Sequence, residues 1–173
     1  MRKDLTRSFI FFIIIASAAG IASAQVDRQF AAIRAQVDAI NGQIATYNKT
    51  TKKVDGISLE GTEADYFVSD DRRLRKINAR ISGETYRAVT ELYYSGDHLI
   101  FAFQRLDRLD GRMTSKIKPK VAGTEESRTY FSNGSLIRYQ TSRTSVRSLG
   151  MRFDEKVNEI ADLSGRLRAA FVQ

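Results

Sequence analysis

Hydrophobic residues recur at helical spacing soon after the N-terminal region. They stand at Val26, Phe30, Ile33, Val37, Ile40, Ile44 and Tyr47, at intervals that alternate between four and three positions. These intervals place all of them along one side of an α-helix. The pattern predicts an amphipathic helix over residues 25–48, and Gly42 is a weak point within it. We expect its apolar side to lie on a sheet; the alternative is a coiled coil formed by two copies of the helix.

The hydrophobic period changes from helical spacing to two between residues 56 and 141. Residues 74–81 alternate in this way, and residues 84–94 are rich in Tyr, Val, Thr and Leu. Both features are typical of β-strands. In the next segment we expect one face to carry Leu99, Phe101 and Phe103, and the other to carry Ile100 and Ala102. Apolar residues on both faces predict a central strand that is covered on both sides.

Three segments share one order of residues: an aromatic pair, a serine, a tight turn, a leucine and a second strand. They are residues 66–74, 93–101 and 130–139. Asn133-Gly134 predicts a type I′ hairpin turn, because both central residues of that turn need positive φ. Gly96-Asp97 fits a type II′ turn for the same reason at its first position. Residues 105–126, which include the single proline, are predicted to be two strand ends joined by a loop.

The chain closes with a second amphipathic pattern that predicts a helix over residues 152–171. Its apolar positions are Phe153, Val157, Ile160, Leu163, Leu167 and Phe171. Two terminal helices with apolar stripes and a run of hairpins predict an α+β fold. We expect an antiparallel β-meander packed against the N-terminal and C-terminal amphipathic helices, with both helices on one face of the sheet.

The first 24 residues have the three parts of a secretory signal peptide. A basic start holds Arg2, Lys3 and Arg7, an apolar run follows from residue 9, and small residues end the segment at 22–24. The apolar run is shorter than the roughly 20 residues that span a bilayer. We therefore expect cleavage, a single domain over residues 25–173 with no membrane span, and a periplasmic or secreted location. The alternative is an uncleaved anchor.

Several kinds of chemistry are excluded or disfavoured by composition. The chain has no cysteine, so disulfides, Cys–His catalysis and a lipid-modified N-terminal cysteine are excluded. Its one histidine, His98, falls in an expected turn, where nothing orients it for catalysis. No nucleotide-binding glycine motif occurs. Glu84 and Glu91 are an odd number of residues apart, so in one regular strand they would face opposite sides. Asp107 and Asp110 alternate with arginines, which is typical of a solvated ladder of ion pairs. We expect no enzymatic activity, no cofactor and no metal site.

Positive charge is the remaining functional signal. The chain carries 28 basic and 20 acidic residues, a net of +8; the expected signal segment accounts for +2 of this, which leaves +6 for residues 25–173. Export disfavours nucleic acid as the partner and favours an envelope polyanion or a periplasmic protein. Tyrosine and arginine often dominate interface energies. From their expected outward direction, the candidate binding residues are Arg80, Tyr86, Tyr93, Arg138 and Tyr139.

Two other functions compete with this binding hypothesis. One is a structural protein that forms a homo-oligomer through the helix at 26–47. The other, less favoured, is a hydrolase that uses carboxylates.

The middle of the chain resembles a class of small exported bacterial proteins of uncharacterised function that carry aromatic β-hairpin repeats. The similar segments are residues 83–85, 91–103 and 128–138, which include Glu91-Leu92-Tyr93-Tyr94 and Tyr130-Phe131-Ser132-Asn133-Gly134. The resemblance implies an exported β-rich domain. It implies no activity and no catalytic residues.

Overall fold

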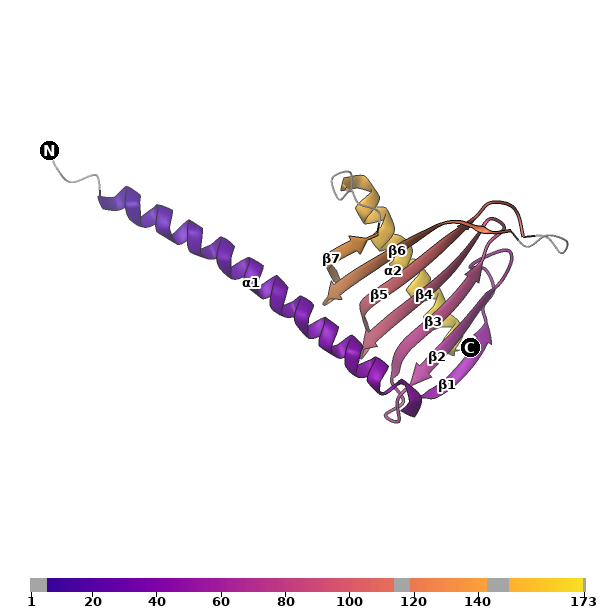
Figure 1. The fold of residues 1–173 in the computed structure, drawn as a ribbon. Helices are drawn as coiled ribbons and strands as arrows, with labels where there is room; N and C mark the ends of the chain where they lie inside the picture. Colours follow the sequence, from indigo (N-terminus) through magenta and orange to yellow (C-terminus); the bar gives the residue numbers. More distant parts are fainter. Residues whose placement is uncertain (1–5, 114–118, 143–149, 173) are drawn as a thin grey trace.

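The computed structural model describes residues 6–113, 119–142 and 150–172, with side chains from Ala24 onward except at 150–154 (Figure 1). Within these residues, a seven-stranded sheet lies between two helices. The elements in chain order are α1 (Thr6–Gly42), the 3-10 turn η1 (Ile44–Thr46), β1 (Asn48–Lys53), β2 (Thr62–Val68), β3 (Leu74–Ser82), β4 (Tyr86–Ser95), β5 (His98–Leu109), β6 (Val121–Ser132), β7 (Ser135–Thr141) and α2 (Gly150–Val172).

The strands form an antiparallel meander in which each strand pairs with the next along the chain. This confirms the expected α+β class. The sheet starts earlier than the expected 56–141, because the polar segment Asn48–Lys53 forms β1 while α1 already ends at Gly42. Nearly all side chains of β1 are exposed at the sheet edge. An exposed edge strand rich in lysine has no apolar alternation, and it discourages pairing with a second sheet.

All three expected hairpins form, and each contains a β-bulge. In the second and third hairpins the bulge lies opposite the aromatic pair, and in the first it lies one residue further on, between Phe67 and Val68; the extra residues in the second strands are Arg75, Ile100 and Ile137. Asn133 and Gly134 have φ of 49° and 77°, as a type I′ turn requires. Gly96 has a φ of 59°, which its expected turn also needs. Each bulge changes which face the following residues occupy.

One face of the sheet is covered by α2, which lies behind the strands in Figure 1. From α2, the main core cluster receives Ile160, Leu163 and Leu167. The sheet side of this cluster comes from β2 to β6. Two tyrosine hydroxyls fix the contact: Tyr66 Oη donates to the Leu167 carbonyl at 3.0 Å, and Tyr94 Oη lies 2.9 Å from Ser164 Oγ. Buried hydroxyls therefore keep hydrogen-bond partners where α2 crosses the sheet.

The opposite face of the sheet is contacted by α1. A second cluster joins its buried residues Ile33 and Ile40 to side chains of β4, β5 and β6. Phe101 belongs to this cluster, whereas its neighbour Ala102 belongs to the α2 cluster. Neighbouring residues in a strand point to opposite faces. The expectation that both helices pack on one face is therefore wrong; an apolar helix stripe does not state which side of a two-sided sheet it covers.

The strand β5 is covered on both faces, as its sequence predicts. The expectation that Leu99 shares a face with Phe101 and Phe103 is wrong: Leu99 packs in the α2 cluster and the two phenylalanines with α1. The bulged Ile100 lies between them and interrupts the alternation. Strand β5 runs to Leu109 and β6 begins at Val121, so residues 105–126 do supply two strand ends. Residues 114–118 between them lie outside the described residues.

The helix α1 runs without a break across Ala24-Gln25, where the sequence predicts cleavage. Its N-terminal part extends away from the sheet (Figure 1). The side chains of residues 1–23 lie outside the described part, so the signal peptide stays a prediction. Among the residues that the structure describes, no helix is long and apolar enough to cross a membrane.

Candidate anion-binding cleft

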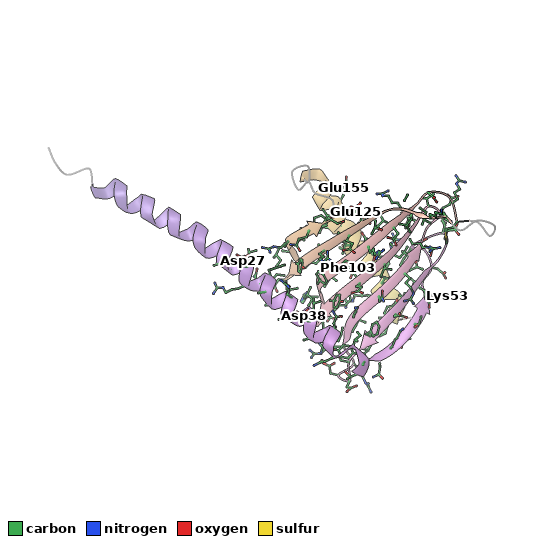
Figure 2. The ribbon with its side chains drawn as sticks, viewed as in Figure 1. Asp27, Asp38, Lys53, Phe103, Glu125 and Glu155 are labelled. Atoms are coloured by element: carbon green, nitrogen blue, oxygen red, sulfur yellow. The ribbon has the colours of Figure 1, made fainter. Side chains whose placement is uncertain are left out.

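A cleft of about 460 Å³ lies between α1 and the last three strands. Its lining comprises Phe30, Arg34, Val37 and Asp38 of α1, Phe101 of β5, Arg128 and Tyr130 of β6, and Arg138 and Gln140 of β7. Figure 2 shows Asp38 on the part of α1 that runs beside the strands, and Phe103 near the middle of the sheet. We call this set of lining residues the arginine cleft.

Local structure places these side chains together. Phe30 and Arg34 are one helical turn apart and so lie on neighbouring parts of the α1 surface. Arg128 and Tyr130 are two residues apart in β6, which puts them on the same face. Tyr130 is paired directly with Arg138 in the β6–β7 ladder. The bulge in this hairpin creates that pairing, because a regular register would place Arg138 on the α2 side.

Two arginines approach the ring of Phe30. The guanidinium carbon of Arg138 lies 4.0 Å from the ring centre, and that of Arg34 lies 5.8 Å away. Arg138 Nη2 is also 3.1 Å from Asp27 Oδ1. Arg34 forms no ion pair with any residue that the structure describes. The charge of Arg34 is therefore available to a ligand, and Arg138 is oriented by both an aromatic ring and an exposed carboxylate.

The third arginine of the cleft, Arg128, is held in a similar way. Its guanidinium carbon lies 5.0 Å from the ring centre of Phe103, and its Nη2 is 3.2 Å from Glu126 Oε2. Both groups of this ion pair are partly exposed. Exposed ion pairs contribute only about 0–1 kcal/mol. An anionic ligand that offers two oxygens to the guanidinium can therefore replace Glu126 at little cost.

Aromatic rings form the floor of the cleft. The Tyr130 ring is centred 4.7 Å from Phe30 and 4.7 Å from Phe101, and the Phe101 ring is centred 5.5 Å from Tyr93. Aromatic pairs in this range stabilise one another beyond their buried area. The row connects α1 to three adjacent strands. It gives the arginines a rigid apolar base.

The charges and rings of the cleft together favour one type of ligand. Three arginines and one aspartate line it, so its formal charge is positive. Guanidinium groups bind carboxylate and phosphate oxygens in a planar, two-pronged geometry. The aromatic floor can contact an apolar or ring-shaped part of the same molecule. The arrangement suits an anionic group attached to a less polar body.

The five sequence-derived binding residues do not form a single site. Arg138 lines the arginine cleft. Arg80 lies on the same face of the sheet but in β3, where its guanidinium binds Asp65 at 2.8 Å and Glu63 at 3.4 Å. The hydrogen bond with Asp65 raises the pKa of Arg80. Arg80 is exposed as expected, but its charge is already paired within the sheet.

Tyr93 is buried, contrary to its expected outward direction, with only 2 % of its surface exposed. Its hydroxyl donates to Glu91 Oε2 at 2.6 Å and accepts from Lys76 Nζ at 2.8 Å. Asn41 Oδ1 of α1 lies 3.0 Å from this hydroxyl and accepts from Lys76 Nζ at 3.2 Å. Burial, and then the Glu91 carboxylate, raise the pKa of Tyr93. Tyr93 therefore anchors α1 and does not present a binding surface.

The other two tyrosines lie on the α2 side of the sheet. Tyr86 packs partly buried against the main core. Tyr139 is half-buried and pairs with Thr129, which shares its face with Phe131 of the α2 cluster. Arg138 and Tyr139 are neighbours in one strand, so they cannot both point to one face. Tyr86, Tyr93 and Tyr139 therefore do not share one face of the sheet.

Sequence reasoning missed Phe30, Arg34 and Arg128 as functional candidates. The apolar spacing assigns Phe30 to a packing seam and Arg34 to a solvated side of the helix. Arg128 did carry a signal, because it alternates with Tyr130 in a strand that leads into a strong hairpin turn. The local sequence pattern does not show that α1 crosses this end of the sheet.

The carboxylate of Asp65, on this face of the sheet, makes the free energy of unfolding depend on pH. Its side chain is only 4 % exposed, and its oxygens accept hydrogen bonds from Arg80 and Thr51. The Arg80 hydrogen bond is the main cause that holds the pKa of Asp65 well below its ordinary 3.8. A carboxyl whose pKa is lower in the folded protein than in the unfolded chain stabilises the fold at pH values above its ordinary pKa. This stabilisation is lost as the pH falls through the pKa of the folded protein.

We expect Asp65→Asn to lower the unfolding free energy by about 1 kcal/mol at neutral pH. We also expect a smaller loss of stability on acidification below about pH 4, because the variant has no proton to bind at this position. Urea titrations at several pH values measure both effects. Equal acid dependence of the variant and the original protein would contradict this role of Asp65.

The two glutamates considered for catalysis are each held in an ion pair. Glu84 pairs with Arg112 at 3.1 Å, and Glu91 pairs with Lys76 at 3.0 Å. Across the described residues, no group of three or more metal-ligating side chains is placed to hold an ion. No family model, curated protein or solved structure matches this chain. Function is therefore inferred from the chemistry of the arginine cleft.

Proposed function

We propose that this protein is a non-enzymatic, exported binding protein of the bacterial envelope that recognises an anionic envelope component at the arginine cleft. The observation that carries the proposal is the convergence of Arg34, Arg128 and Arg138 over an aromatic floor. Export to the periplasm or the exterior is supported by the basic, apolar and small-residue order of the first 24 residues.

The rival proposal of self-association through the helix at 26–47 has weaker support. Its apolar seam is occupied within the monomer, since Ile33 and Ile40 are buried and Phe30 and Val37 pack beside them on the sheet. A coiled coil would have to remove these side chains from the aromatic row. An anionic partner at the cleft requires no such rearrangement.

The test is co-sedimentation of the protein with purified bacterial envelope fractions at low and high salt. We expect binding at low salt that weakens at high salt, because the contacts are between partly exposed charges. Replacing all three cleft arginines by glutamine should weaken binding roughly a hundred-fold, at about five-fold for each lost charge.

A matched variant separates the cleft from net charge alone. Arg73, Arg112 and Arg166 are also exposed, but each is held in an ion pair away from the cleft. Replacing these three by glutamine removes the same charge and should change binding by less than about three-fold. Equal losses in the two triple variants would contradict the proposal. Binding that is insensitive to salt would point to a protein partner instead.

A further inference from the structure

A second cavity lies on the opposite face of the sheet, between α2 and the strands β3 to β5. Its volume is about 530 Å³, within the range of about 300–1,000 Å³ that is usual for small-molecule sites. Its apolar lining is Ile57, Ile81, Ala88, Leu106, Leu109 and Leu163. It shares no lining residue with the arginine cleft. We call it the α2 cavity.

Tyr86 forms one wall of the α2 cavity, and Gly83 determines its place. A Cβ at position 83 would overlap the Tyr86 ring, so only glycine allows the ring to lie there without a shift. Tyr86 is paired directly with Arg108 in the β4–β5 ladder. The Tyr86 hydroxyl has no hydrogen-bond partner among the described residues. Residues paired across a ladder share one face of the sheet, so Arg108 also lies on the cavity side.

The charges around the α2 cavity leave one cation mainly unpaired. The two acids of the lining are paired within α2: Glu159 with Lys156 at 2.6 Å, and Asp162 with Arg166 at 2.9 Å. The side chain of Arg108 is 60 % exposed, and its one ion pair is 4.0 Å long. A negative group at Arg108 would therefore meet little competition.

We propose that the α2 cavity binds a fatty carboxylate, with its chain against the apolar lining and its carboxylate on Arg108. Charge complementarity selects this occupant. A neutral chain would form no ion pair with Arg108, and the cationic group of a zwitterion would find the acids of the cavity already paired. The site is independent of the arginine cleft, because the two lie on opposite faces of the sheet.

The probe is decanoate, with decanol as the neutral comparison of equal chain length. Calorimetric titration should show that the protein binds decanoate more tightly than decanol. Arg108→Gln should weaken decanoate binding about ten-fold and leave decanol binding unchanged, since one charge-assisted contact is lost. Arg108 is exposed, so the variant should fold normally. The triple glutamine variant of the arginine cleft should bind decanoate as the original protein does.

Methyl NMR on the same samples locates the ligand. We expect decanoate to shift the methyl signals of Ile81, Leu106 and Leu163, and to leave those of Ile33 and Ile40 on the opposite face unchanged. No binding of decanoate, equal binding after Arg108→Gln, or shifts confined to the α1 face would each overturn the proposal. Equal binding of decanol and decanoate would overturn it as well, because the cavity would then be only an apolar surface.

Discussion

Replacing Leu167 by alanine should lower the free energy of unfolding by about 3 kcal/mol. Leu167 is fully buried where α2 crosses the main core. Its removal leaves a cavity that the strands cannot close, because the Tyr66 hydroxyl holds the helix backbone at this residue. The melting temperature should fall by roughly 6–12 °C for a domain of this size. Urea and thermal unfolding followed by circular dichroism measure the effect.

Leu59 provides the matched control. It is the same residue type but is fully exposed. Leu59→Ala should change stability by less than about 0.5 kcal/mol. A small effect of Leu167→Ala, similar to that of Leu59→Ala, would mean that α2 does not pack on the sheet as described.

The second large effect is expected at Lys76, which is buried beneath α1. Its ammonium donates to Glu91, Tyr93 and Asn41. Lys76→Met removes the counterion of Glu91 and the donor to the other two oxygens. Breaking a fully buried ion pair costs about 3–5 kcal/mol. Because Glu91 keeps some contact with water, we expect a loss of about 2 kcal/mol.

The position of α1 should respond to the same change. Hydrogen exchange of the α1 amides near Ile40 should become faster in Lys76→Met, because the network joins Asn41 to the sheet. Lys53→Met is the control: Lys53 is exposed on β1 and forms no ion pair with the described residues (Figure 2). It should leave both stability and exchange unchanged. Unaltered exchange in Lys76→Met would show that the network does not hold α1.

The sequence predicted those elements that have a clear local pattern of hydrophobic or turn-forming residues. The α2 stripe and the Asn133-Gly134 turn could be located because their patterns are local. The helix predicted over 25–48 was correct for the part of its apolar seam up to Ile40 but not in its bounds. The helix α1 runs from Thr6 to Gly42, so Ile44 and Tyr47 of the predicted seam lie beyond its end. Strand β1 could not be predicted, because an edge strand with exposed side chains needs no hydrophobic residues at alternate positions.

The candidate site was harder to predict than the elements that build it. Which face a residue occupies depends on the bulges at Ile100 and Ile137, and nothing in a period-two pattern states where one extra residue is inserted. The Ile137 bulge turns Arg138 toward α1 and Tyr139 toward α2. The local pattern places Tyr93 on an outward face of its strand, and it is buried only because α1 covers that face. Long-range packing, which local pattern does not encode, therefore decided most of the site.

The most direct test of the arginine cleft is an NMR titration that observes the arginine side-chain Nε–Hε signals of ¹⁵N-labelled protein. Inorganic pyrophosphate is the probe, because it offers phosphate oxygens without any other recognition element. We predict that it shifts the signals of Arg34, Arg128 and Arg138 first and most strongly, and that added salt reverses the shifts. Shifts spread evenly over all arginines, or strongest at the exposed pair Arg72 and Arg73, would contradict a binding site at the cleft.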